Sequence, residues 1–216
     1  TTFGSGQRGD LQAIWAAILL DDEARDVTRA SDPSFGKIRE PVIRFAHWAR
    51  NLVPIENAPR SNSLMRNAFE TRRLNQQAFH SPSVFNFYRP GYVATGYPSA
   101  DRDLVNPEMQ ITFESSLVGY FDLMQDHIER PNRADGYNPD YSSLVGMAHD
   151  ADALIAHFDR LLTNGVLRDD TRARIKAAIE TIALEIGADT EQQRRSERVK
   201  TALLWFIASP EFMVQK

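Results

Sequence analysis

Cysteine is absent from the 216-residue sequence, and this absence excludes several kinds of protein. Without cysteine the chain has no disulfide framework, no thiolate metal site and no cysteine nucleophile. Lysine is scarce as well, with 4 residues against 21 arginines. Because a guanidinium group forms fixed, forked contacts with carboxylates, this bias favours defined ion pairs over loosely solvated charge.

Long apolar runs are also absent. No stretch approaches the run of about 18 apolar residues that marks a transmembrane helix, and no basic segment leads into an apolar run near Thr1. The sequence therefore predicts neither a membrane span nor a signal peptide. Because the chain starts with Thr1 and a glycine-containing stretch, we expect a fragment or a processed product of a larger protein.

Motifs that would identify a reaction are missing too. The sequence contains no nucleophile elbow, no phosphate-binding glycine loop and no two-histidine zinc helix, so we expect neither a cofactor nor a metal. His149, Asp150, Asp152 and His157 form the densest group of histidine and carboxylate residues. Asp150 is better explained as the cap of the next helix than as a metal ligand. The catalytic residues, if there are any, are unknown at this stage.

Apolar periodicity and cap residues predict a mainly helical chain. Asp10 and Asp150 are placed to cap helices, and Pro41 and Pro107 suit the first turn of two others. The expected helices cover residues 11–20, 41–53, 63–79, 107–130, 151–164, 171–187 and 190–212. The last three are joined by short loops, as antiparallel neighbours in a bundle are.

The fold class expected from this pattern is all-α. We expect an irregular multi-helix bundle with long aromatic and proline-rich loops and little or no sheet. The chain should form a single helical unit over residues 1–216. Its parts are a helical pair (1–53), a basic and aromatic loop-rich segment (54–105) and a helical bundle (106–216).

Charge is distributed unevenly along the chain. Residues 37–90 hold nine Lys or Arg and three Glu, which leaves a net charge of −10 for the rest of a chain whose total is −4. Arg44, His47 and Arg50 of this block fall outside the apolar stripe of the helix expected after Pro41. Two interpretations stay open: the basic segment pairs with the acidic remainder of the fold, or it binds an anionic ligand. The acidic total and the lack of a nucleic-acid motif argue against a nucleic-acid partner.

The segment "HSPSVFNFYRPGY", from His80 to Tyr92, fits neither helical nor strand periodicity. Six of the 21 aromatic residues of the chain lie between Phe79 and Tyr97. Burial of one large apolar side chain contributes roughly 1.5 to 3 kcal/mol, so we expect this segment to be mostly buried as an aromatic anchor. The alternative is an exposed aromatic platform on which Arg89 faces an anionic polymer such as a charged glycan.

Several blocks of the chain carry a family resemblance. "GDLQAIWAAILLDDEARD", "GKIREPVIRFAHWAR", "HSPSVFNFYRPGY" and "NPEMQITFESSLVGYFDLMQ" resemble, in order and spacing, blocks of the bacterial domain-of-unknown-function family 1800. The later "NPDYSSL", "DALIAHFDRLLTNGVL" and "ASPEF" are similar as well. Members of that family are considerably longer, so the resemblance implies that this chain corresponds to their C-terminal half.

The resemblance implies a mainly helical bacterial protein that is exported to the periplasm, the outer surface or the exterior. It also implies a partner, the product of a neighbouring gene that resembles sulfatases and phosphatases, and it supplies no catalytic residue. The first hypothesis is a non-catalytic structural or partner-binding component of the cell envelope or exterior. The second is a hydrolase or glycan-processing accessory whose cleft is shared with the missing N-terminal half. Its candidate binding residues are His80, Phe87, Arg89 and Glu114.

Overall fold

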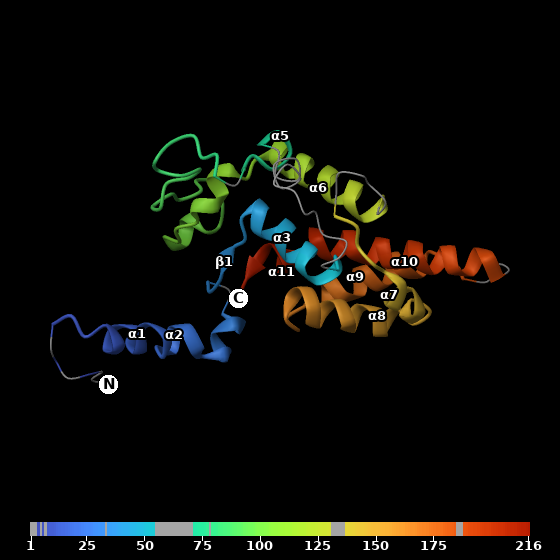
Figure 1. Ribbon diagram of the computed structural model, residues 1–216, viewed down its shortest axis with the longest axis horizontal. Helices are drawn as coiled ribbons and strands as arrows, with labels where there is room; N and C mark the ends of the chain where they lie inside the picture. The colour runs from blue at the N-terminus through green and yellow to red at the C-terminus, as the bar shows by residue number, and fades with distance from the viewer. Residues whose placement is uncertain are drawn as a thin grey trace. The chain divides into compact units, whose positions relative to one another are not determined.

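The computed structural model describes residues 4, 6, 8–32, 34–54, 71–77, 79–130, 137–184 and 188–216. Within these residues helices dominate and the sheet has two short strands, which confirms the predicted all-α class (Figure 1). The chain divides into two compact units, one formed by Thr1–Lys37 with Lys216 and the other by Ile38–Gln215. The helices expected to pair within residues 1–53 therefore belong to different units.

The elements follow one another in mostly short helical pieces. The α-helices are α1 (Leu11–Leu19), α2 (Asp22–Arg25), α3 (Pro41–Leu52), α5 (Thr71–Leu74), α6 (Glu114–Glu129), α7 (Ser142–Met147), α8 (Ala151–Phe158), α9 (Asp169–Glu180), α10 (Ala188–Ala208) and α11 (Pro210–Met213). The 3₁₀ turns are η1 (Val27–Ser31), η3 (Ala100–Arg102) and η4 (Pro107–Ile111), and η5 (Asp159–Thr163) is a π-helical turn. Strand β1 (Lys37–Ile38) pairs with β2 (Val214–Gln215).

The first unit consists of short helices that have N-cap hydrogen bonds but no buried residues among those described. The carboxylate of Asp10 accepts a hydrogen bond of 3.0 Å from the amide of Ala13, which confirms the predicted cap of α1. Asp21 caps α2 in the same way, through the amide of Glu23 at 2.8 Å. Not one described residue of this unit up to Lys37 is buried, so its helices have local hydrogen bonds but no core of their own.

The second unit holds the hydrophobic core. Helix α10 contacts α6, α7, α8 and α9, and it runs along this bundle in Figure 1. Its predicted interior residues Val199, Leu203 and Phe206 are fully buried, which confirms the third helix of the bundle. The same core cluster includes Phe45 of α3, whose ring centroid lies 5.1 Å from that of His127 and 5.0 Å from that of Tyr137. Burial of these rings joins α3 to α6.

The buried face of α3 is rotated from the predicted stripe. Arg44, expected to lie outside the stripe, is only 2% exposed. Its Nε atom donates to the carbonyl oxygen of Arg39 at 2.7 Å, and its guanidinium lies 5.4 Å from the ring centroid of Tyr120. Because Phe45 and Trp48 centre the buried face, their neighbour Arg44 turns inward and is accommodated by a carbonyl and an aromatic ring.

The single helix predicted over residues 107–130 is wrong, because the chain breaks at Thr112 and Phe113. Both residues have extended backbone angles between η4 and α6. The hydroxyl of Ser116 accepts a hydrogen bond of 3.0 Å from the amide of Phe113 and donates to the carbonyl of Ile111. Ser116 therefore stabilises a helix start at Glu114, a local competition between side chain and backbone that periodicity does not reveal.

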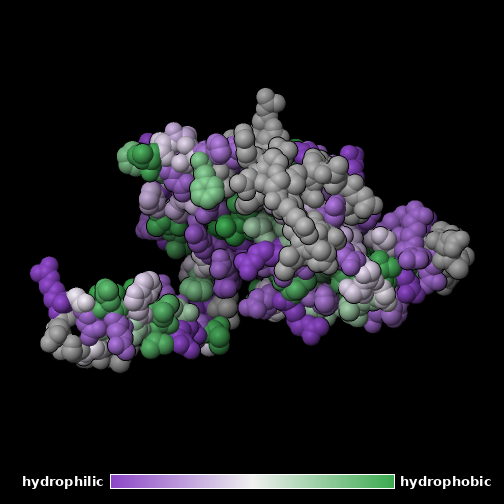
Figure 2. All heavy atoms as spheres, viewed as in Figure 1, coloured by the Kyte–Doolittle hydropathy of each residue, from purple (hydrophilic) through white to green (hydrophobic). Residues whose placement is uncertain are grey.

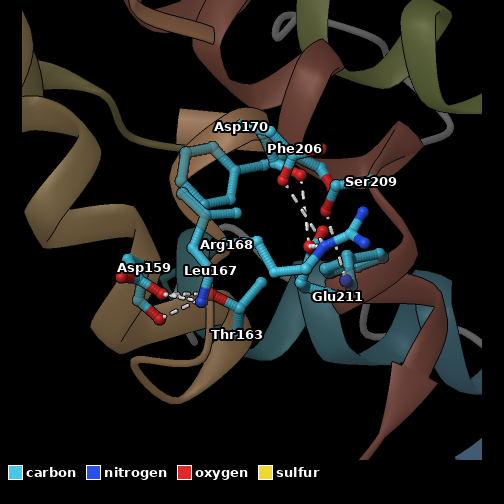
Figure 3. Close-up of polar contacts among 10 residues, drawn as sticks. Asp159, Thr163, Leu167, Arg168, Asp170, Phe206, Ser209 and Glu211 are labelled. Carbon is cyan, nitrogen blue, oxygen red and sulfur yellow. Dashed lines mark hydrogen bonds and ion pairs between the residues drawn. The ribbon is translucent and has the colours of Figure 1, made fainter. Parts of the chain in front are cut away.

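A buried polar cluster shapes the end of α8. Its helix passes through the π turn η5 and stops at Asn164 and Gly165, which have left-handed backbone angles (φ 58° and 77°). One carboxylate oxygen of Asp159 accepts hydrogen bonds from the hydroxyl of Thr163 at 2.6 Å and the amide of Leu167 at 3.1 Å (Figure 3). The other oxygen accepts from Arg172 of α9 at 2.6 Å. Asp159 thus ties the turn to the next helix.

The closing "ASPEF" block forms a second set of hydrogen bonds between helices, shown beside the contacts of Asp159 in Figure 3. The hydroxyl of Ser209 donates to the carbonyl of Phe206 at 2.8 Å and accepts from the amide of Phe212 at 3.2 Å, which caps α11. Glu211 accepts a hydrogen bond of 2.7 Å from Nε of Arg168. These contacts hold α11 against the loop that precedes α9.

Two predicted segments fall partly outside the described residues. Most of the helix expected over 63–79 lies there, and its described part contains α5. The helix expected over 171–187 is too long, because α9 ends at Glu180 and the described residues 181–184 are not helical; residues 185–187 lie outside the described residues.

Candidate functional site

The aromatic segment from His80 to Tyr92 is irregular, as expected, but the prediction that it is mostly buried is wrong. Residues 80–86 and 89–91 are exposed, with Phe85 at 77%, whereas Phe87, Tyr88 and Tyr92 are half-buried. Polar contacts fix its backbone instead. The side chain of Gln110 accepts a hydrogen bond of 2.8 Å from the amide of Arg89. The half-buried rings and this hydrogen bond therefore both hold the segment, while most of its residues face solvent.

A second polar side chain holds the following loop. The Oδ1 atom of Asn106 accepts from the amide of Ala94 at 3.1 Å, and its Nδ2 atom donates to the hydroxyl of Ser99 at 2.8 Å. The amide of Asn106 also donates to the carbonyl of Tyr92 at 2.9 Å. Asn106 thus crosslinks the loop between Tyr92 and η4, and its side chain makes no capping hydrogen bond to η4.

The structure brings two of the four candidate binding residues into one pocket. Phe87 and Arg89 line a cavity of about 550 Å³, together with Ser83, Phe85, Asn86, Tyr88, Pro90 and Gln110. His80 and Glu114 do not line it. His80 is exposed, and Glu114 is the exposed first residue of α6, where it forms no ion pair with any residue that the structure describes.

Tyr88 lies at the edge of a polar chain that the sequence did not indicate. Its hydroxyl forms a hydrogen bond with Glu40, and burial, reinforced by Glu40 and Glu108, raises the pKa of the phenol. The carboxylate of Glu40 also accepts from Nε2 of Gln76, whose Oε1 accepts from the amide of Val42 at 3.1 Å. The sequence shows only that Glu40 directly precedes Pro41, the first residue of α3, where a carboxylate is favourable because of the helix dipole. It does not show that Glu40 contacts Tyr88.

Other carboxylates considered as sites have structural partners. Asp122 and Asp126 of α6 both accept hydrogen bonds from Arg73, the second at 2.6 Å, so this face pairs with the basic segment. Asp150 accepts from the amide of Ala153 at 3.0 Å, which confirms its role as a cap. Across the described ranges, no group of three or more His, Asp or Glu side chains is placed to hold a metal ion.

A group of exposed apolar side chains lies in α1. The side chains of Leu11, Trp15 and Ile18 are 67%, 60% and 56% exposed. Their neighbours Ile14, Leu19 and Leu20 are exposed as well. Hydrophobic residues of this unit lie uncovered at its surface in Figure 2. The sequence predicted this helix correctly but gave no sign that its apolar face is bare.

Comparison with known proteins gives a family and no function. The sequence profile of a family described as "Protein of unknown function (DUF1800)" matches residues 1–214. The chain belongs to the DUF1800 family. The narrower expectation, that the chain corresponds to the C-terminal half of DUF1800 proteins, is not borne out by this match. No curated protein and no solved structure matches the chain. Among the described helices of this DUF1800 protein, none is long and apolar enough to span a membrane.

Proposed function

We propose that this DUF1800 protein is a non-catalytic, partner-binding component of the bacterial cell envelope or exterior, and that α1 is its binding helix. The observation that carries the proposal is the bare apolar face of α1, formed by Leu11, Ile14, Trp15 and Ile18. Burial of one such side chain contributes roughly 1.5 to 3 kcal/mol, so covering this face would release considerable free energy. A contiguous exposed apolar patch is typical of a protein interaction site.

The length of α1 supports the same conclusion. It has nine residues, and isolated helices shorter than about 12 to 15 residues are marginal in water. The unit that contains α1 has no buried residue among those described, so the unit itself does not cover the helix. A helix of this kind gains stability when its apolar face lies in a groove, which is a common mode of recognition.

Charge indicates the chemistry of the partner. Residues 10–32 hold six acidic and two basic residues, and Asp22 and Glu23 follow α1 directly on the exposed surface. A groove with an apolar floor and a basic rim would complement this segment. A second copy of the chain fits less well, because two acidic segments would meet. We propose the product of the neighbouring sulfatase- or phosphatase-like gene as the partner and export as the setting, both on the family resemblance.

The test measures binding of the full chain to that gene product by titration calorimetry. Trp15→Glu places a charge at the centre of the α1 face and should weaken binding at least about 30-fold, as loss of a buried aromatic anchor does. Val118→Glu is the matched control, because Val118 is 69% exposed on α6. Equal affinities of the two variants would contradict the proposal. Self-association of the chain alone that Trp15→Glu abolishes would instead assign the face to a second copy.

A second candidate function, a hydrolase or glycan-processing accessory, is favoured by the pocket of the aromatic segment. Phe87 and Arg89 line it with amide and hydroxyl side chains, a combination suited to a charged sugar ring. Oligogalacturonate is a suitable probe for binding and for the release of reducing ends. Phe87→Ala and Arg89→Gln should each abolish binding, whereas Arg102→Gln, a change at an exposed arginine outside the pocket, should not.

A further inference from the structure

A pocket on α3 collects cationic and apolar side chains from the basic block of residues 37–90. It has a volume of about 530 Å³, within the range of small-molecule sites. Helix α3 supplies five lining residues, Ile43, Ala46, His47, Arg50 and Asn51. The other two are Arg39, which directly follows β1, and Gln215 of β2. No acidic side chain lines the pocket within the described part of the chain. Its charge is therefore positive.

The two arginines lack the partners that other arginines of this protein have. Arg73, Arg168 and Arg172 each form an ion pair with a carboxylate. Arg39 and Arg50 form none with the residues that the structure describes. Instead, Nη1 of Arg39 donates to the carbonyl of Phe212 at 2.5 Å, and its guanidinium lies 5.6 Å from the ring centroid of Phe212. Arg39 is thus fixed in place, and no carboxylate among the described residues forms an ion pair with it.

The floor of the pocket is fixed by the C-terminal segment. The Nε2 atom of His47 lies 3.0 Å from the carbonyl oxygen of Leu162 and donates to it, and its ring centroid lies 5.6 Å from that of Phe212. Ser209 caps α11 and thereby holds Phe212 against both side chains. The "ASPEF" block therefore serves as the rigid support of the pocket. Because burial lowers the pKa of His47, the two arginines carry the positive charge at neutral pH.

We propose that this pocket binds a small organic anion whose phosphate, sulfate or carboxylate group contacts Arg39 and Arg50, and whose apolar body lies on Ile43 and Ala46. Guanidinium groups match all three anions through forked, charge-assisted hydrogen bonds. Ile43 is 46% exposed at the pocket, so it offers apolar area to the ligand. The site is distinct from α1, and it does not depend on the partner proposed above.

Titration calorimetry of the full chain with phenyl phosphate tests the charged part of the site. Arg50→Gln should weaken binding about tenfold, the loss expected for one charge-assisted contact. Arg174→Gln is the matched control, because Arg174 is an exposed arginine on α9 outside the pocket. Equal affinity of the two variants, or no binding of phenyl phosphate by the wild type, would overturn the proposal. Phenyl sulfate and benzoate, titrated at the same ionic strength, show which anionic group the site prefers.

Comparison with inorganic phosphate tests the apolar part. Wild-type protein should bind phenyl phosphate several-fold more tightly than inorganic phosphate, because only the former covers Ile43. Ile43→Ser should remove this difference and leave the affinity for inorganic phosphate unchanged. Equal affinities for the two probes in the wild type would refute an organic ligand. Because Arg39 also holds Phe212, Arg50 and Ile43 are the variants that test the site without disturbing α11.

Discussion

Helices α1 and α10 have similar apolar periodicity, but the apolar face of α10 is buried and that of α1 is exposed. Val199, Leu203 and Phe206 of α10 are fully buried, whereas Leu11 and Trp15 of α1 are 67% and 60% exposed. The difference lies in what surrounds each helix. α10 contacts α6, α7, α8, α9 and α11 of its unit, whereas no described residue in the unit of α1 up to Lys37 is buried. Periodicity determines which residues share a helix face, and only the rest of the fold determines whether that face is covered.

The largest effect should come from truncating the covered face. Phe206→Ala should lower the free energy of unfolding by about 3 to 5 kcal/mol, because it leaves a cavity in a packed core. Trp15→Ala should change it by no more than about 0.5 kcal/mol, because the indole is exposed. Urea denaturation followed by circular dichroism measures both. A large cost for Trp15→Ala would break the comparison, because it would mean that the chain itself covers α1.

The next effect concerns the buried hydrogen bonds that Asp159 accepts at the end of α8. Asp159→Ala should cost about 3 kcal/mol, because it leaves Arg172 and the amide of Leu167 without their acceptor. Asp170→Ala is the control, since the side chain of Asp170 is 58% exposed and its loss should cost less than about 0.5 kcal/mol. Thermal denaturation measures both effects. Equal midpoint temperatures for the two variants would contradict a structural role for Asp159.

A close backbone contact gives a smaller and more specific effect. A Cβ atom added at Gly119 would lie 2.4 Å from the carbonyl oxygen of Arg73, where α5 approaches α6. Gly119→Ala should therefore cost about 1 to 3 kcal/mol. Gly146→Ala in α7 is the matched control, because no atom lies within 4 Å of its added Cβ atom. That variant should be neutral or more stable than wild type, since alanine favours a helix by up to about 1 kcal/mol.

The smallest effect is a pH dependence that originates at His47. Burial lowers its pKa from the ordinary value of 6.5, and the charges of Arg39 and Arg50 act in the same direction. The unfolded chain therefore binds a proton at a higher pH than the folded chain does. Stability should fall as the pH drops below 6.5, until the folded-state pKa is reached. His47→Gln should show a weaker decline over this window, and an identical decline in both proteins would refute the assignment.

The sequence predicted those parts of the fold that depend on residues within a single segment, such as helix caps and the buried face of a helix. Asp10 and Asp150 cap their helices as predicted, and the interior residues of α10 are buried as their spacing indicated. The failures occurred where a distant group decided the outcome. Arg44 turns inward because Tyr120 and the carbonyl of Arg39 receive it, which a stripe on α3 alone does not show.

The candidate site was predictable only in part. Phe87 and Arg89 share a pocket as residues of one short segment, but Gln110, which fixes the backbone there, is distant in sequence. The aromatic count suggested burial, and the structure shows exposed rings on a hydrogen-bonded loop, because composition does not determine on which side a ring lies. For Arg39 and Arg50 the excess of positive charge was the signal, but the contact of Arg39 with Phe212 of α11, which is distant in sequence, was not predictable.

Hydrogen exchange of the α1 amides tests directly whether α1 is an uncovered helix that binds a partner. It should be measured in the full chain alone and with the neighbouring gene product, and α10 of the same chain serves as the internal reference. We expect the α1 amides to exchange much faster than the α10 amides in the chain alone, because the apolar face of α1 is exposed, and we expect the partner to slow this exchange. Protection of α1 equal to that of α10 in the chain alone, or no change with the partner, would refute α1 as the binding helix.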